Sequence, residues 1–171
     1  MSIHQRPPEA DGKRFGDFEM DTIVGNDNQG AILTIVERST NMLFMRKLEH
    51  GKDADELAQV AIALLAPYKA LVKTVTTDNG TEFCNHKAIA RALDTTVYFT
   101  DSYSSWQKGA IENANGLIRQ YITKSSPIRH LKDRDIDEIT AIINTRPRKK
   151  LNFQLLLRSF SLTFCKFVLA C

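Results

Sequence analysis

Short apolar runs separated by turn residues dominate the first third of the chain. Residues 18–24, 31–37 and 42–48 are rich in β-branched, aromatic and other apolar positions, which is typical of strands. A glycine- and asparagine-rich stretch at 25–30 separates the first two runs, and the polar residues 39–41 separate the second two. Because both connections are short, we expect the three strands to form an antiparallel meander.

The apolar pattern changes to helical spacing at residue 53. Leu57, Val60, Ala61 and Leu64 share one stripe of a helix at 53–65, and Pro67 ends it. Strands and helices alternate beyond this point. The expected elements are a strand at 72–76, a helix at 86–93, a strand at 96–99, and helices at 109–121 and 135–143. The order β-β-β-α-β-α-β-α-α predicts an α/β fold, with a mixed sheet and flanking helices.

Length and composition narrow the class of protein. A chain of 171 residues with 43% hydrophobic and 25% charged residues is ordinary for one globular domain. No apolar run reaches the ~18 residues of a transmembrane helix, so we expect no membrane association. The N-terminus lacks an apolar signal core, and three cysteines without a Cys-x-x-Cys pair favour a reduced protein. We therefore expect a cytosolic location.

Charge is distributed unevenly along the chain. The net charge is only +3, but residues 139–171 contain six basic residues and no acidic residue. The body before them is therefore mildly acidic. A basic stretch of this kind favours an acidic partner such as nucleic acid, although a solvated basic surface is the alternative.

Three acidic residues stand where a carboxylate needs a partner or marks a site. Asp21 lies mid-strand, where it is either paired, bound to a cation or solvated on an open sheet face beside Glu19. Asp78 directly follows the strand at 72–76, although Asp-Asn-Gly is also an ordinary turn. Glu112 lies in the first helical turn, where it also complements the helix dipole. Carboxylates without histidine or cysteine partners favour Mg²⁺ or Mn²⁺ over zinc.

The helix at 109–121 has two distinct faces. The expected buried stripe consists of Ile111, Ala114, Ile118 and Tyr121. On the opposite face, Glu112, Asn115 and Arg119 form a row of a carboxylate, an amide and a guanidinium. Such an exposed row suits a site that handles metal and phosphate side by side.

Four segments together resemble the catalytic core of DDE-type transposases, in the integrase and ribonuclease H-like superfamily. They are GDFEMDTIVG at 16–25, TDNGTEF at 77–83, YSSWQKGAIENANGLIRQY at 103–121 and NTRPRKKL at 144–151. Their order and the 34 positions from Asp78 to Glu112 are similar to those of the family. The pattern is most similar to that of the insertion-sequence family numbered thirty.

This resemblance implies a ribonuclease H-like fold in which Asp21, Asp78 and Glu112 form the catalytic triad and hold two Mg²⁺ or Mn²⁺ ions. The implied activity is metal-dependent cleavage and strand transfer of DNA during transposition, with no small-molecule substrate. The implied partners are the element ends, the target DNA and further copies of the chain, in the bacterial cytosol and nucleoid. The residues expected to bind DNA are Trp106, Lys108, Asn115, Arg119, Arg146, Arg148, Lys149 and Lys150.

The resemblance divides the chain into a connector at 1–16, an integrase-type catalytic core at 17–151 and a divergent tail at 152–171. The abrupt change to an apolar, acid-free tail suggests a shifted reading frame. Since the family's N-terminal helix-turn-helix region has no counterpart here, we expect a catalytic-core fragment.

Several alternatives remain open. One is an inert truncated product that only binds DNA or a full-length transposase. Another is a phosphate-handling hydrolase with an aspartate nucleophile, although Glu19 stands where that nucleophile belongs. The alternative to DNA contact is a solvated surface charge for each basic residue and a packed side chain for Trp106.

Overall fold

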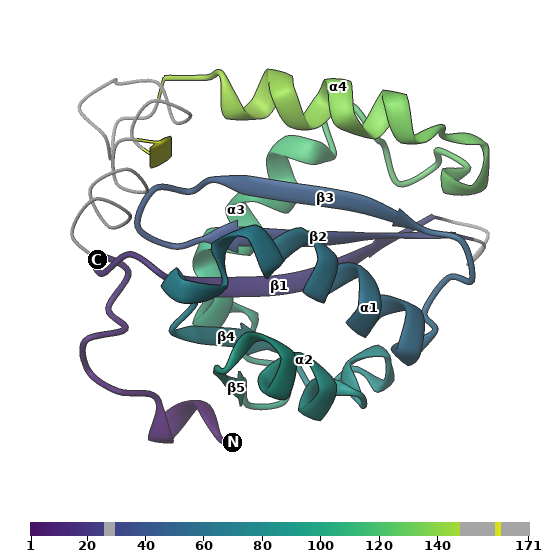
Figure 1. Cartoon of the computed structure of the whole chain (residues 1–171). Coiled ribbons are helices and arrows are strands. Elements are labelled where there is room, and N and C mark those ends of the chain that lie inside the picture. The colour runs from purple at the N-terminus through teal and green to yellow at the C-terminus, as the bar shows by residue number, and fades with distance from the viewer. Residues whose placement is uncertain (26–29, 148–159, 162–171) are drawn as a thin grey trace.

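Within residues 1–25, 30–147 and 160–161, which the computed structural model describes, five strands form one mixed sheet (Figure 1). They are β1 (Asp17–Val24), β2 (Ala31–Glu37), β3 (Leu43–Leu48), β4 (Thr74–Thr77) and β5 (Thr96–Phe99), in the spatial order β3-β2-β1-β4-β5. The first three strands pair antiparallel, whereas β4 pairs parallel to β1 and β5 parallel to β4. The predicted meander and mixed sheet are confirmed.

Helices cover both faces of the sheet (Figure 1). On one face lie α1 (Ala54–Leu65) and α2 (His86–Leu93), and on the other lie α3 (Gly109–Ile118) and α4 (Asp133–Asn144). Short 3₁₀ turns connect these elements: η1 (Ile3–Gln5), η2 (Ala66–Leu71), η3 (Thr81–Phe83), η4 (Ser105–Lys108) and η5 (Ile128–His130). The result is a three-layer arrangement with one apolar core on each side of the sheet.

β1 contributes to both cores because its side chains alternate between the two faces. Phe18 and Met20 pack in the core under α1 and α2, whereas Ile23 packs in the core under α3 and α4. Glu19 and Asp21 share the face of Ile23. The central strand therefore directs two carboxylates toward α3.

The predicted boundaries differ from the structure where 3₁₀ turns or tertiary contacts intervene. The strand expected from residue 72 begins at Thr74, because η2 ends only with the Val72 N–H bonded to the Lys69 carbonyl. α3 ends at Ile118 instead of residue 121. Tyr121 is consequently 37% exposed, and its expected place in the buried stripe was wrong.

Residues 1–16, expected to be a connector, pack along the sheet. The Phe99 N–H donates to the Met1 carbonyl at 2.8 Å, and Ser2 forms a parallel bridge to Phe99 at the edge of β5. Gly16 then turns into β1 with φ of +102°, and a Cβ there would lie 2.1 Å from the Leu71 carbonyl oxygen. Only glycine fits this position without displacing the backbone.

The divergent tail at 152–171 lies outside the described residues, apart from Phe160 and Ser161. The buried Phe160 ring packs against Phe15, Phe44 and Tyr68, with centroid distances of 5.3, 5.9 and 5.2 Å. This tail residue therefore belongs to the core beneath α1. The shifted reading frame stays a prediction.

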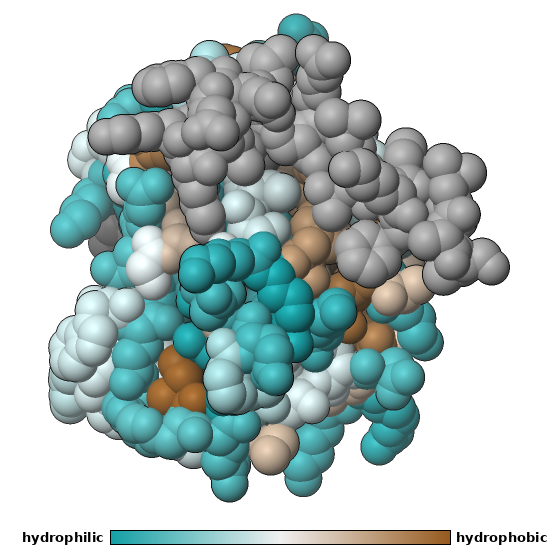
Figure 2. Space-filling view, turned by 90° about the vertical axis from the view of Figure 1, so that its left-hand side faces the viewer, coloured by the Kyte–Doolittle hydropathy of each residue, from teal (hydrophilic) through white to brown (hydrophobic). Residues whose placement is uncertain are grey.

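Hydrophilic side chains predominate on the face shown in Figure 2, where hydrophobic side chains appear among the coloured residues only in small areas. No helix within the described ranges is both long and apolar enough to cross a membrane.

Candidate active site

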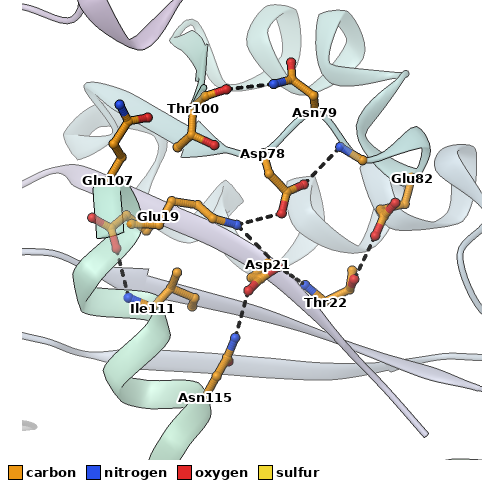
Figure 3. Close-up of polar contacts among 12 residues, drawn as sticks. Glu19, Asp21, Thr22, Asp78, Asn79, Glu82, Thr100, Gln107, Ile111 and Asn115 are labelled. Atoms are coloured by element: carbon orange, nitrogen blue, oxygen red, sulfur yellow. Dashed lines mark hydrogen bonds and ion pairs between the residues drawn. The ribbon is translucent and has the colours of Figure 1, made fainter. Parts of the chain in front are cut away.

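Asp21 and Asp78 come from neighbouring parallel strands and point toward the same space (Figure 3). Asp21 lies within β1, and Asp78 immediately follows β4. Glu19 pairs with Thr76 in the parallel register, so two residues further along each chain Asp21 and Asp78 stand side by side. Strand pairing thus joins two acids that are far apart in sequence.

Both acids line a cleft of about 490 Å³, which Glu112 and the loop after β5 also line. Glu112 is exposed in the first turn of α3. Among the residues that the structure describes, no three His, Cys, Asp or Glu side chains are grouped closely enough to share a metal ion. The structure therefore brings Asp21 and Asp78 together and places Glu112 on the wall of the same cleft.

Lys108, the last residue of η4, lies between the two carboxylates. Its Nζ is 2.9 Å from Oδ2 of Asp78 and 3.4 Å from Oδ1 of Asp21, and the side chain is only 3% exposed. Lys108 was expected either to contact phosphate or to be a solvated surface charge. The second alternative was wrong, because the ammonium is buried in an ion pair with both acids.

Asp21 is held by polar partners on both carboxylate oxygens. Asn115 Nδ2 donates to Oδ2 at 2.9 Å, and the Thr22 N–H donates to Oδ1 at 2.9 Å (Figure 3). Burial raises the pKa of Asp21 above its ordinary value, and the Lys108 ammonium opposes this shift. A half-buried carboxylate already paired with a cation is a suitable ligand for a divalent cation.

Asp78 stands at the start of the Asp-Asn-Gly turn. Its Oδ1 accepts the Gly80 N–H at 3.0 Å, and Asn79 Nδ2 donates to the Thr100 carbonyl at 2.7 Å (Figure 3). The two interpretations of this motif are therefore compatible: the segment is an ordinary turn, and the turn aims Asp78 into the cleft.

α3 runs along β1, and polar contacts join the two elements at successive helical turns. The Ile111 N–H donates to Glu19 at 2.9 Å, Asn115 Nδ2 to Asp21 at 2.9 Å, and Arg119 Nη2 to the Val24 carbonyl at 3.1 Å. Four helical residues rise about 6 Å, close to the rise of about 6.6 Å for two strand residues. This match lets the first two contacts fall on consecutive inward-facing residues of β1, Glu19 and Asp21. The longer Arg119 side chain reaches a backbone carbonyl three residues beyond Asp21.

These contacts correct the predicted exposed row on α3. Asn115 and Arg119 are half-buried and bonded to β1, and only Glu112 remains exposed. The prediction treated polar residues as solvated, but the acidic face of β1 supplies polar partners for this side of the helix.

Glu19 fixes the beginning of α3. Its carboxylate is 1% exposed, and it accepts Arg38 Nε at 2.8 Å on Oε1 and the Ile111 N–H at 2.9 Å on Oε2. The residue preceding α3 makes no side-chain cap bond, so the Glu19 carboxylate takes that role from the neighbouring strand. The helical turn that carries Glu112 is thereby tied to the strand that carries Asp21.

Glu82 was missed by the sequence analysis. Its Oε1 accepts Thr22 Oγ1 at 2.9 Å and Lys52 Nζ at 2.8 Å. Burial raises the pKa of Glu82, but hydrogen bonds from Lys52, the Glu82 backbone N–H and Thr22 outweigh this effect, so the pKa is lowered. The sequence signal for Glu82 is its position four residues after Asp78, within the segment TDNGTEF at 77–83.

The remaining residues expected to bind DNA are placed as follows. Trp106 is 73% exposed, so the packed alternative was wrong. The Arg146 guanidinium lies 5.5 Å from the centroid of the Tyr121 ring and donates to its hydroxyl. Arg148, Lys149 and Lys150 lie outside the described residues. DNA contact by these side chains stays a prediction.

The amino-acid sequence is similar to those of known proteins. The chain is 45% identical over 154 residues to the transposase for insertion sequence element IS4351 of Bacteroides fragilis, covering 90% of this chain and 47% of the relative. It is 35% identical to the transposase InsI for insertion sequence element IS30C of Escherichia coli strain K12, covering 89% and 40%. The chain thus spans less than half the length of these relatives.

A solved structure shows the same fold. A chain of the cryo-EM structure of the simian T-cell lymphotropic virus intasome, in complex with PP2A regulatory subunit B56 gamma, matches with a TM-score of 0.61 at 14% identity. The match covers 75% of this chain and 48% of the other. The fold is the expected ribonuclease H-like α/β fold. The integrase core domain matches residues 8–105, more than half of the sequence, and this chain therefore belongs to the integrase core domain family.

Proposed function

We propose that this chain is the catalytic core of an insertion-sequence transposase, a polynucleotidyl transferase that cleaves and joins DNA strands. The observation that carries the proposal is that strand pairing places Asp21 and Asp78 side by side in a cleft that Glu112 also lines. Membership of the integrase core family and the named transposase relatives support it. The proposed substrates are the element ends and the target DNA, and we expect the chain to act as more than one protomer.

Integrase core domains generally use divalent metal ions, and the residues of this cleft fit such ions. Carboxylate oxygens are the ligands that Mg²⁺ and Mn²⁺ prefer, and Asp21 and Asp78 already hold a cationic group, the Lys108 ammonium. In the proposed site Asp21, Asp78 and Glu112 would hold two ions. When bound, the ions would activate the attacking oxygen and stabilise the leaving oxygen at the scissile phosphate.

The chain's own residues orient the acids for this task. Asn115 and the Thr22 N–H fix both oxygens of Asp21, and the Gly80 N–H fixes one oxygen of Asp78. Preorganised ligands of this kind do not need to be ordered again when the substrate binds.

DNA is proposed to reach the cleft along the loop before α3. Trp106 is exposed there and available to stack on a base, and the basic residues at 146–150 are proposed to contact phosphates.

The test is nicking of a supercoiled plasmid in MnCl₂ by the purified chain. We expect nicked circles with the wild type and none with Asp78→Asn or Glu112→Gln. Asp137→Asn is the matched control, because it removes one carboxylate charge from an exposed position on α4 and should nick like the wild type.

Two results would reject the proposal. DNA binding in a mobility-shift assay without nicking by the wild type would favour the inert alternative. A phosphoryl group trapped covalently on an aspartate during turnover would favour the hydrolase, because the proposed reaction forms no covalent protein intermediate.

A further inference from the structure

Lys108 lines the cleft at a position that the proposed function leaves unexplained. A buried lysine is costly unless its charge is paired, and Lys108 is paired with two acids at once. The ammonium is too deep to be a surface charge, and it contacts both of the acids that would hold the proposed metal ions.

The contacts show what the lysine does for the two acids. Asp21 and Asp78 are brought side by side by strand pairing, and two carboxylates in one cleft repel each other. The Lys108 ammonium, at 3.4 Å and 2.9 Å from them, offsets that repulsion. The repulsion between the acids also contributes to the raised pKa of Asp21.

These contacts also mean that the Lys108 ammonium would compete with a metal ion for the two acids. A divalent ion held by Asp21 and Asp78 would meet an ammonium that donates to Asp78 Oδ2 and pairs with Asp21 Oδ1. Two cations cannot share these oxygens at contact distance without strong repulsion.

We propose that Lys108 is an exchangeable positioning residue, which holds Asp21 and Asp78 in place when no divalent ion is bound and leaves them when one binds. This inference rests on the proposed function. The long flexible stem of lysine lets the released ammonium remain in the cleft, where the phosphate of a bound DNA strand is the anion available to it. We therefore expect Lys108 to contact phosphate only after a metal ion has bound.

The experiment measures Mn²⁺ affinity by isothermal titration calorimetry on chelator-treated protein, and the melting temperature without metal. Lys108→Met should bind Mn²⁺ about tenfold more tightly, equivalent to about 1.4 kcal/mol. It should also melt at a lower temperature without metal, because the repulsion between the acids is no longer offset. Lys108→Arg keeps the cation and should restore both values toward those of the wild type.

Lys52→Met is the matched control for charge. Lys52 pairs with Glu82 at 2.8 Å beside the cleft but has no ion pair with Asp21 or Asp78. This variant loses one positive charge and should leave the affinity for Mn²⁺ unchanged. Far-UV circular dichroism establishes that each variant is folded, and Lys108→Gln replaces Lys108→Met if the latter is not.

The outcomes separate this inference from the proposed function. Unchanged or weaker Mn²⁺ binding by folded Lys108→Met overturns the exchange, and so does an equal gain in Lys52→Met. If Asp78→Asn binds Mn²⁺ as the wild type does, the proposed metal site itself fails. Loss of binding in Asp78→Asn with no gain in Lys108→Met removes only the role of Lys108.

Discussion

Glu19→Gln tests how the acidic strand holds α3. The wild-type carboxylate is 1% exposed and joins Arg38 to the Ile111 N–H through its two oxygens. A glutamine has the same shape but one acceptor oxygen. If that oxygen accepts the Ile111 N–H, the amide NH₂ faces the guanidinium and leaves it without its carboxylate partner. The variant should therefore be destabilised although no volume is lost.

The expected magnitude follows from the burial of the pair. Removing one partner of a buried ion pair costs roughly 3–5 kcal/mol. The Arg38 side chain is 14% exposed and also donates to the Ala10 carbonyl, so its charge keeps some contact with water and with a polar group in the variant. We therefore expect the lower end of the range, about 3 kcal/mol, a large share of the 5–15 kcal/mol that is typical for folded proteins.

Urea unfolding followed by far-UV circular dichroism measures this change. With a slope of about 1.5 kcal/mol/M, the midpoint should fall by about 2 M while the slope stays the same. Glu138→Gln is the control: it removes a carboxylate that pairs with Arg134 on the exposed surface of α4, and it should shift the midpoint little. If Glu19→Gln lowers the free energy of unfolding by less than about 1 kcal/mol, the value for an ordinary neutral hydrogen bond, the charge of Glu19 does not stabilise the start of α3.

Three further predictions concern other parts of the molecule. Gly16→Ala should destabilise the fold by at least about 3 kcal/mol in the same unfolding assay, because its Cβ would meet the Leu71 carbonyl oxygen at 2.1 Å at a positive φ; a near-neutral result would contradict this. Asn144→Leu should cost roughly 2–4 kcal/mol in thermal unfolding, since the buried amide bonds both the N–H and the carbonyl of Leu43, at 3.0 and 2.8 Å; unchanged stability would show these bonds to be dispensable. Because the pKa of Asp21 is raised, protons should compete with Mn²⁺ at a pH above the ordinary aspartate value of 3.8; calorimetric affinity should fall as pH is lowered through that region, and a midpoint at or below 3.8 would count against it.

The sequence by itself determined most of the secondary structure. β2, α2 and β5 begin and end where the apolar pattern places them. α1 starts after Asp53, whose side chain accepts the Glu56 N–H at 2.8 Å, so a local capping bond sets that boundary. These features depend on neighbours within a few residues, and such neighbours are visible in the sequence.

The sequence also pointed to the three acids, through their positions in strands, turns and a helix and through the family's motifs. It could not show which of them meet. Asp21 and Asp78 lie together because β4 pairs with β1 in parallel, across an intervening meander and helix. The position of Glu112 depends in turn on where α3 docks, which is fixed by Glu19 on β1 and by Arg38 in the turn after β2.

Only the tertiary structure decided which polar side chains are solvated and which are paired. Asn115, Arg119 and Lys108 were assigned to an exposed, DNA-facing surface, yet each has partners on or beside β1 or β4. Helical periodicity separates apolar from polar faces, but it does not report what stands opposite a polar face. Here an acidic strand stands opposite, and the free energy of burying its charges is met by partners from distant parts of the chain.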